Sequence, residues 1–155
     1  ILPVLSIRDN ISVSVLDNLK SGISISRKKE NELAKSVIET YDVKTPGSDK
    51  EIQFLSGGNQ QKVIIGRAMA CKPKLLVFDE PTKGIDVGTK TEIYRLMKKL
   101  AEEEGIGIIM ISSEMEEIKK CSNRVIAMYE GKIAGEFDEY TEQQSILGAI
   151  IGVNS

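Results

Sequence analysis

The stretch Leu55–Asp86 places the tightest constraint on the fold of this 155-residue chain. It begins with LSGGNQQK, in which two glycines precede a run with the composition of a helix, and it ends with LLVFDEPTKGID. The second run is an apolar strand, Leu75–Phe78, followed directly by the carboxylates Asp79 and Glu80. A glycine pair that opens a helix can bind an anion, and carboxylates at the end of a strand can bind a metal ion, which together are two parts of a nucleotide site. We therefore expect the rest of the chain to support this unit.

The elements that follow alternate between helices and strands. Val87–Glu104 carries apolar residues at helical spacing and is stopped by Gly105, and Ile106–Ser112 is the next apolar strand. Strands that alternate with helices predict an α/β fold with a mainly parallel sheet. The continuous apolar run Leu75–Phe78 further predicts a strand that is buried on both faces, and we expect Ile106–Ser112 to be buried as well.

The first fifty residues have a different, helical character. Ser6 opens a capping box for a helix that we expect to reach about Leu19, and Ser26 caps a second, charged helix. We predict an N-terminal helical subdomain over residues 1–50. The remaining residues, 51–155, then form the α/β core.

The end of the chain combines a hairpin with a helix. Val125–Met128 and Lys132–Phe137 flank a Glu-Gly turn at Gly131, which predicts two antiparallel strands. Thr141 is the predicted cap of a last helix. We expect this helix to turn four apolar residues inward: Ile146, Leu147, Ile150 and Ile151.

Composition excludes several classes of function. The 23 acidic and 21 basic residues are interspersed without a basic block, so no nucleic-acid footprint is visible. The chain has no histidine, and Cys71 and Cys121 lie in no metal-binding spacing, which excludes a zinc set. The longest apolar stretches are the length of a strand, so we expect no membrane-spanning segment.

Ser56, Gly57 and Gly58 directly precede a helix that we expect to begin at Asn59. Unpaired backbone N–H groups and the positive end of the helix dipole would then face outward beside the Ser56 hydroxyl, which predicts an anion site. Taken alone, SGG favours a simpler interpretation, a serine cap followed by two turn glycines. The motifs that accompany it favour the anion site.

Asp79 and Glu80 follow the buried strand at the edge where open α/β folds bind ligands. Asp79 can hold Mg²⁺ through water, and Glu80 can orient and deprotonate an attacking water. If the pair stood alone, it could equally well cap the next turn. Pro81 and Asp86 behind it favour the catalytic interpretation.

These motifs resemble those of ABC ATPases. LSGGNQQK is similar to their signature sequence, LLVFDEP to their Walker B strand and Thr82–Asp86 to their D-loop, and 23 positions (79 − 56) separate Ser56 from Asp79. The resemblance covers nearly the whole chain and implies a P-loop NTPase-like fold, here incomplete. It further implies ATP and Mg²⁺ as cofactors.

The family also implies roles for individual residues. Its signature serine and glycines reach the γ-phosphate of an ATP held by the opposite domain. The resemblance therefore implies that a set of signature residues acts in trans on ATP: Ser56, Gly57, Gly58, Asn59 and Gln60. Asp86 would stand at the interface between the domains and link the two ATP sites.

Finer features are similar to the second, C-terminal nucleotide-binding domain of monosaccharide importers of the ribose, galactose and xylose type. The matching runs are Asn59–Lys62, Gly84–Gly88 and Ile111–Glu114. Ser113 falls where most ABC domains have the switch histidine. A serine has no imidazole for the γ-phosphate, so we expect the site that contains Glu80 to be the weaker one in hydrolysis.

The sequence contains no Walker A motif, G-x-x-x-x-G-K-[ST]. The run Gly84–Thr91 comes near to the motif, but its second glycine stands one place too early. The chain alone should therefore neither bind ATP tightly nor hydrolyse it. Its start at Ile1, without methionine or signal peptide, suggests a fragment whose N-terminus lies upstream.

The function expected from these features is that of an ATP-binding subunit fragment of an ABC importer for a monosaccharide. Its partners would be permease subunits, contacted through the helical subdomain, another nucleotide-binding domain and, indirectly, a sugar-binding protein, with no nucleic acid. It would lie in the cytoplasm on the inner face of the cell membrane. Two alternatives remain: a soluble ABC-type ATPase of repair or translation, and a non-catalytic interaction module.

Overall fold

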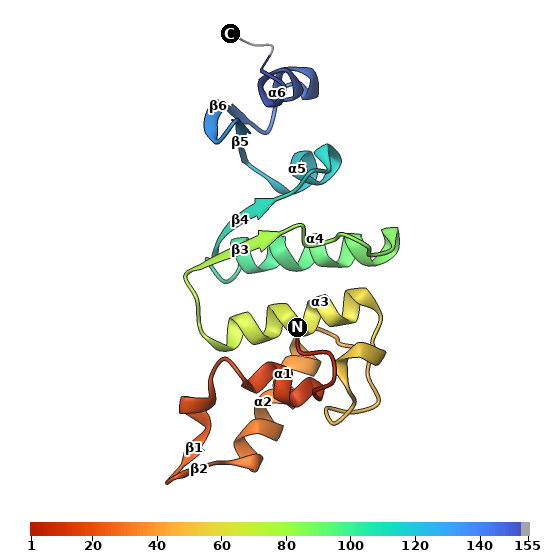
Figure 1. Cartoon of the computed structure of the whole chain (residues 1–155), viewed down its shortest axis with the longest axis vertical. Coiled ribbons are helices and arrows are strands. Elements are labelled where there is room, and N and C mark those ends of the chain that lie inside the picture. Colours follow the sequence, from red (N-terminus) through yellow and green to blue (C-terminus); the bar gives the residue numbers. More distant parts are fainter. Residues whose placement is uncertain (153–155) are drawn as a thin grey trace. The chain divides into compact units, whose positions relative to one another are not determined.

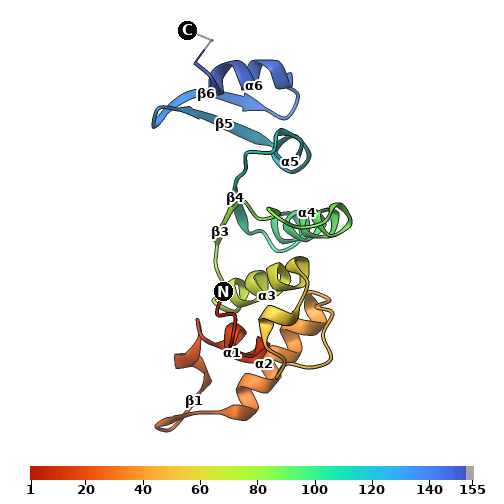
Figure 2. The same cartoon turned by 45° about the vertical axis from the view of Figure 1, so that its right-hand side comes forward.

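The computed structural model describes residues 1–152 (Figures 1 and 2). The chain divides into two compact units. Unit 1 comprises Ile1–Val77 and Pro81–Ile109, and unit 2 comprises Phe78–Glu80 and the chain from Met110 onward. Among the described residues, no helix is long and apolar enough to cross a membrane. The predicted division at residue 50 stays a prediction.

Three helices form the centre of unit 1: α1 (Ile7–Ser12), α2 (Arg27–Thr40) and α3 (Gly57–Ala70). Each buries an apolar stripe against the other two, as helical spacing predicts. The buried cluster consists of Ile7, Ile11, Ala34, Val37, Val43, Ile52 and Val63.

The close approach of α2 and α3 depends on Gly66. A Cβ atom at Gly66 would lie 2.2 Å from a methyl group of Val37 and 3.1 Å from the ring of Tyr41. Only a glycine leaves this space for the two side chains of α2. Burial raises the pKa of the Tyr41 hydroxyl, and the negative charge of Glu104 raises it further.

The first helix is shorter than predicted. The Ser6 cap is confirmed, because Ser6 Oγ accepts a hydrogen bond from the Asp9 N–H at 3.1 Å, but α1 ends at Ser12 rather than near Leu19. A 3₁₀ helix, Leu16–Leu19, and a small hairpin of β1 (Lys20–Ser21) and β2 (Ser24–Ile25) follow. The β-branched Val13 and Val15 favour this departure, and the 3₁₀ turn still buries Leu19.

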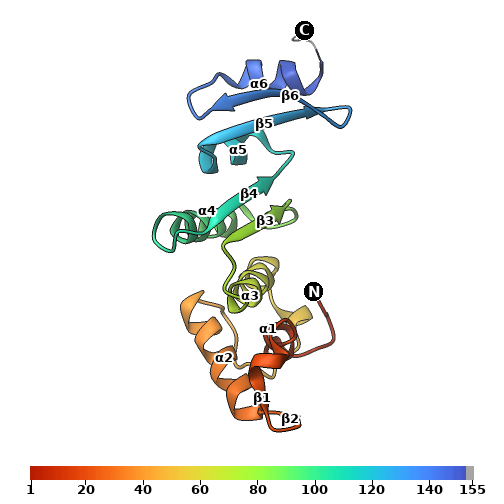
Figure 3. The ribbon, with the colours of Figure 1, turned by 90° about the vertical axis from the view of Figure 1, so that its left-hand side faces the viewer.

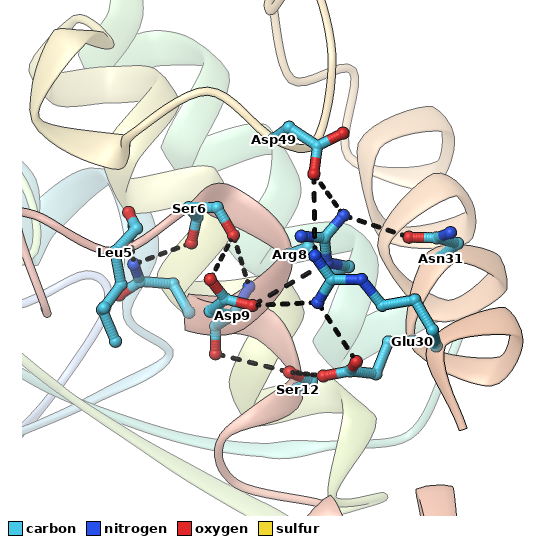
Figure 4. Close-up of polar contacts among 10 residues, drawn as sticks. Leu5, Ser6, Arg8, Asp9, Ser12, Glu30, Asn31 and Asp49 are labelled. Atoms are coloured by element: carbon cyan, nitrogen blue, oxygen red, sulfur yellow. Dashed lines mark hydrogen bonds and ion pairs between the residues drawn. The ribbon is translucent and has the colours of Figure 1, made fainter. Parts of the chain in front are cut away.

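Hydrogen bonds hold the segment that precedes LSGG against the N-terminal residues of the chain. Backbone hydrogen bonds join Ile7 N–H to Lys50 O and Arg8 N–H to Ser48 O, both at 2.9 Å. The buried Arg8 guanidinium also pairs with Asp49 and donates to Asn31 of α2 at 3.2 Å (Figure 4). A short 3₁₀ helix, Ile52–Phe54, follows and directly precedes the signature.

The next elements are β3 (Leu75–Asp79), α4 (Val87–Glu102) and β4 (Gly107–Ile111). The two strands form one sheet and run parallel, since Gly107 N–H bonds to Lys74 O at one end and Glu80 N–H bonds to Ile111 O at the other. The helix α4 ends at Glu102, two residues before the predicted end, and Gly105, with a φ of +67°, lies in the turn that follows.

The prediction that β3 is buried on both faces is wrong, and β4 is less buried than predicted. Leu76 and Phe78 are buried, but Leu75 and Val77 are more than half exposed, and Ile109 is 48% exposed. The physical reason is that burial alternates along β3, so within residues 1–152 other elements cover only one face of the strand.

In unit 2, α5 (Met115–Cys121) precedes the predicted hairpin, β5 (Arg124–Tyr129) and β6 (Lys132–Asp138), and α6 (Gln143–Ile150) lies along it (Figure 3). The hairpin turn is as predicted, with positive φ at both Glu130 and Gly131.

Two details of α6 differ from the prediction. Its cap is Glu142 rather than Thr141, because the Thr141 hydroxyl instead donates to Asp138 at 2.8 Å. Ile146 is fully buried, as predicted, together with Ala149. The other three residues expected to face inward are exposed, since the hairpin covers only one narrow stripe of so short a helix: Leu147, Ile150 and Ile151.

Candidate functional site

The signature residues stand at the N-terminus of α3 in unit 1. Ser56 has extended backbone angles, as an N-cap residue should, but its side chain makes no capping hydrogen bond. Within residues 1–152, the N–H groups of Gly57, Gly58 and Asn59 have no hydrogen-bond acceptor. Three backbone donors, one hydroxyl and the positive end of a 14-residue helix therefore gather at one point.

The two glycines bring this helix end against the start of α4. A Cβ atom at Gly58 would lie 1.9 Å from the methyl group of Thr89, whereas one at Gly57 would make only ordinary contact with Ile85 at 3.7 Å. Gly58 is thus required for the packing of α3 on α4. Gly57 is not required for that packing, so its lack of a side chain mainly leaves the helix end open.

Asp86 is the cap of α4 and lies in the same region of unit 1. It accepts from the Thr89 N–H at 3.0 Å and from the Thr89 hydroxyl at 2.6 Å. These two hydrogen bonds, the hydroxyl first, lower the pKa of the exposed Asp86 carboxyl. Because Thr89 also touches Gly58, the structure brings the predicted D-loop residue and the signature together.

The side chains of Asn59 and Gln60 are engaged within the protein. Asn59 Nδ2 donates to Ser56 Oγ at 2.9 Å, and its Oδ1 accepts from the Lys44 N–H at 2.7 Å. Gln60 Nε2 donates to Leu55 O at 2.9 Å. Their predicted contact with ATP stays a prediction, and these hydrogen bonds give both side chains a second role.

Lys62 is a residue whose role the sequence motif did not reveal. It is buried, and its ammonium group pairs with Glu92 of α4 at 2.8 Å and donates to Asp42 O at 3.2 Å. The only sequence signal was a lysine one turn after Asn59, on the face that the apolar spacing of α3 assigns to the interior. Lys62 ties α3 both to α4 and to the loop after α2.

The predicted catalytic residues Asp79, Glu80 and Ser113 belong to unit 2. Asp79 is exposed at the end of β3, and Glu80 follows with a φ of +46°, which is uncommon outside glycine. Two hydrogen bonds hold this conformation: Glu80 N–H donates to Ile111 O at 2.9 Å, and Ser113 N–H donates to Glu80 Oε1 at 3.0 Å.

Ser113 therefore contacts the Glu80 carboxylate through its own backbone N–H group and not through its hydroxyl. Its neighbour Ser112 accepts from the Glu114 N–H at 3.0 Å and donates to Glu117 at 2.7 Å, which fixes the turn after β4. One Glu80 oxygen is thus held and the other is available for a proton. The arrangement is compatible with a carboxylate that orients water, and this role of Glu80 stays a prediction.

The residues at this edge fit part of a magnesium site. No group of three or more histidine, cysteine or carboxylate residues that could hold a metal occurs among the described residues. Mg²⁺ usually takes one or two carboxylates and obtains its other ligands from water and phosphate. An exposed Asp79 matches the carboxylate part of that pattern, and its role as a magnesium ligand stays a prediction.

Comparisons with known proteins agree with this arrangement. The family profile described as ABC transporter matches residues 2–83, more than half of the chain. The chain is 43% identical over 150 residues to the ribose import ATP-binding protein RbsA 1 of Rubrobacter xylanophilus. That match covers 96% of this chain but only 30% of that protein.

Solved structures match the fold. A nucleotide-free ATP-binding cassette from an ABC transporter has a TM-score of 0.81 at 22% identity, covering 99% of this chain and 64% of that one. The dimeric post-hydrolysis cassette MJ0796, bound to ADP and Pi, has a TM-score of 0.71 at 25% identity, covering 90% and 59%. The predicted P-loop NTPase-like α/β fold is thereby confirmed, and the chain belongs to the ABC transporter family.

Proposed function

We propose that this chain is part of the ATP-binding subunit of an ABC importer for a monosaccharide. Its Ser56, Gly57 and Gly58 would complete an ATP site whose phosphates are bound by another nucleotide-binding domain. The observation that carries this proposal is the open N-terminus of α3, where three backbone N–H groups and one hydroxyl are available to an anion. The 43% identity to a ribose import protein supports a monosaccharide as the cargo.

The carboxylates of unit 2 would serve a second ATP site. Asp79 would hold Mg²⁺ through water, and the ion would neutralise charge on the phosphates. Glu80, held by the Ser113 N–H, would orient the attacking water and accept its proton. Since Ser113 offers no imidazole, we assign the weaker hydrolysis to this site.

The remaining parts would convert hydrolysis into transport. Two ATP molecules between the domains would close the dimer, with Asp86 at the interface, and hydrolysis would reopen it. The helical subdomain would pass this movement to permease subunits, and an external sugar-binding protein would deliver the cargo. This assigns the chain to the inner face of the cell membrane. Without a Walker A lysine, the chain alone should not hydrolyse ATP.

A chimera tests this function. In the chimera, this chain replaces the matching 150 residues of the Rubrobacter protein, and ATP hydrolysis and ribose uptake are measured with the permease of that system. We expect Mg²⁺-dependent hydrolysis and ribose uptake by the chimera, and neither by this chain alone. A folded chimera that binds ATP without hydrolysing it or supporting uptake would contradict the proposal.

A further inference from the structure

We infer that Asn59 is a positioning residue that turns the Ser56 hydroxyl outward as a hydrogen-bond donor and connects it to the loop that follows α2. The inference rests on the proposed function, because it concerns the same anion site. It starts from two hydrogen bonds of one amide group, to Lys44 N–H and to Ser56 Oγ.

The orientation of the Asn59 amide is determined by its first partner. A backbone N–H can only donate, so the atom of Asn59 that lies 2.7 Å from Lys44 N must be the oxygen Oδ1. The amide nitrogen Nδ2 then necessarily faces Ser56 Oγ, at 2.9 Å. A flipped amide would place two donors against each other at Lys44.

The amide in turn determines the direction of the hydroxyl proton. Ser56 Oγ accepts from Nδ2, so its own O–H must point away from Asn59. Ser56 is exposed, and within residues 1–152 its hydroxyl proton has no acceptor. The proton is thus available to an anion at the same helix end as the N–H groups of Gly57 and Gly58.

The same face of α3 holds the loop after α2 at two points. Lys62, one turn beyond Asn59, donates to Asp42 O at 3.2 Å, so the segment Asp42–Lys44 is bound at both ends. Asp42 has a φ of +49°, which marks a tight change of direction directly after the Tyr41 cap of α2. A displacement of the end of α2 would therefore act on Asn59 and through it on the Ser56 hydroxyl.

The substitution Asn59→Asp separates this role from a general structural one. A carboxylate of the same shape can still accept from the Lys44 N–H, but it cannot donate to Ser56 Oγ and instead attracts the hydroxyl proton. Asn59→Ala removes both bonds. Amide hydrogen exchange of Lys44 in this chain and ATP hydrolysis by the chimera are the two readouts, and thermal unfolding establishes that each variant is folded.

We expect N59D to keep the protection of the Lys44 amide, whereas N59A raises its exchange rate about tenfold. In the chimera, N59D should lower the hydrolysis rate about tenfold, and the double variant S56A/N59D should be no slower than S56A alone. That non-additivity is the signature of a residue that acts through Ser56.

Two results would overturn the inference and one would overturn its foundation. If N59D hydrolyses ATP like the parent while S56A does not, Asn59 has no positioning role but the proposed function stands. If N59A leaves the Lys44 amide protected, the link to the loop is absent. If S56A itself leaves hydrolysis unchanged, the proposed function fails.

Discussion

The signature end of α3 and the carboxylate edge after β3 are built in opposite ways. The first offers mainly backbone N–H groups and depends on close packing. Gly58 lies against Thr89, and Asn59 and Lys62 are hydrogen-bonded to neighbouring segments. The second presents side chains, with Asp79 exposed and Glu80 held by two hydrogen bonds. Some substitutions at the signature should therefore lower stability, whereas substitutions at the carboxylate edge should leave stability unchanged.

The largest expected effect concerns chemistry at the signature. Ser56→Ala should lower ATP hydrolysis by the chimera about 100-fold, the usual consequence of losing one donor to a developing charge. The unfolding temperature should stay within about 1 °C of the parent, because Ser56 makes no side-chain cap bond and its one hydrogen bond, from Asn59 Nδ2, is exposed. A large loss of stability in S56A would mean that the serine is a structural cap.

The next effect tests the packing of the signature. Gly58→Ala should reduce the free energy of unfolding by about 2 kcal/mol, because its Cβ would meet the Thr89 methyl group. Thr89 cannot simply rotate away, since its hydroxyl bonds to Asp86. Urea unfolding of the 155-residue chain measures the change.

Two glycines of the same chain provide controls for this prediction. Gly47→Ala meets no atom within 4 Å, and Gly57→Ala makes only ordinary contact, so both should change stability by less than about 0.5 kcal/mol. Thr89→Ser should recover part of the loss in G58A by removing the methyl group. Equal stability of G58A and G47A would refute the close contact.

A third prediction concerns the buried lysine that ties the signature helix to α4. Glu92→Ala removes the charged partner of Lys62 and should cost about 1–2 kcal/mol, since within residues 1–152 the buried ammonium group then keeps one acceptor, Asp42 O. On the same helix, Glu102→Ala removes an exposed pair with Lys98 and should change stability by less than about 0.5 kcal/mol. Equal effects of the two substitutions in urea unfolding would show that burial of Lys62 is unimportant.

The smallest expected effect concerns the carboxylate edge. Glu80→Gln keeps an oxygen for the Ser113 N–H, so the fold should be unchanged. If the site without a switch histidine contributes little hydrolysis, E80Q should lower the total rate of the chimera less than twofold. A loss as large as that of S56A would reverse the assignment of the weaker site.

The sequence predicted the elements that depend on strong local signals. The Ser6 and Ser26 caps, the Glu-Gly hairpin and the order of helix and strand after Leu55 all appear in the structure. Local signals failed where tertiary contacts decide. The end of α1, the covered face of β3 and the inward face of α6 depend on which neighbours are present.

The candidate site shows the same limit. The motif identified Ser56 and its glycines, but the partners of Asn59 and Lys62 come from Lys44, Asp42 and Glu92, which are distant in sequence. No periodicity links these residues, so only the fold could reveal their contacts. The sequence thus indicated which residues form the candidate site but not the contacts that hold them in place.

The most direct test of the central claim is hydrogen exchange in the segment Leu55–Lys62 of the chimera, with and without Mg-ATP. If the signature binds an ATP held by another domain, ATP should protect the amides of Gly57 and Gly58, and inactivating the phosphate loop of the other domain should abolish that protection. Protection that persists after this inactivation, or no protection at all, would contradict the claim.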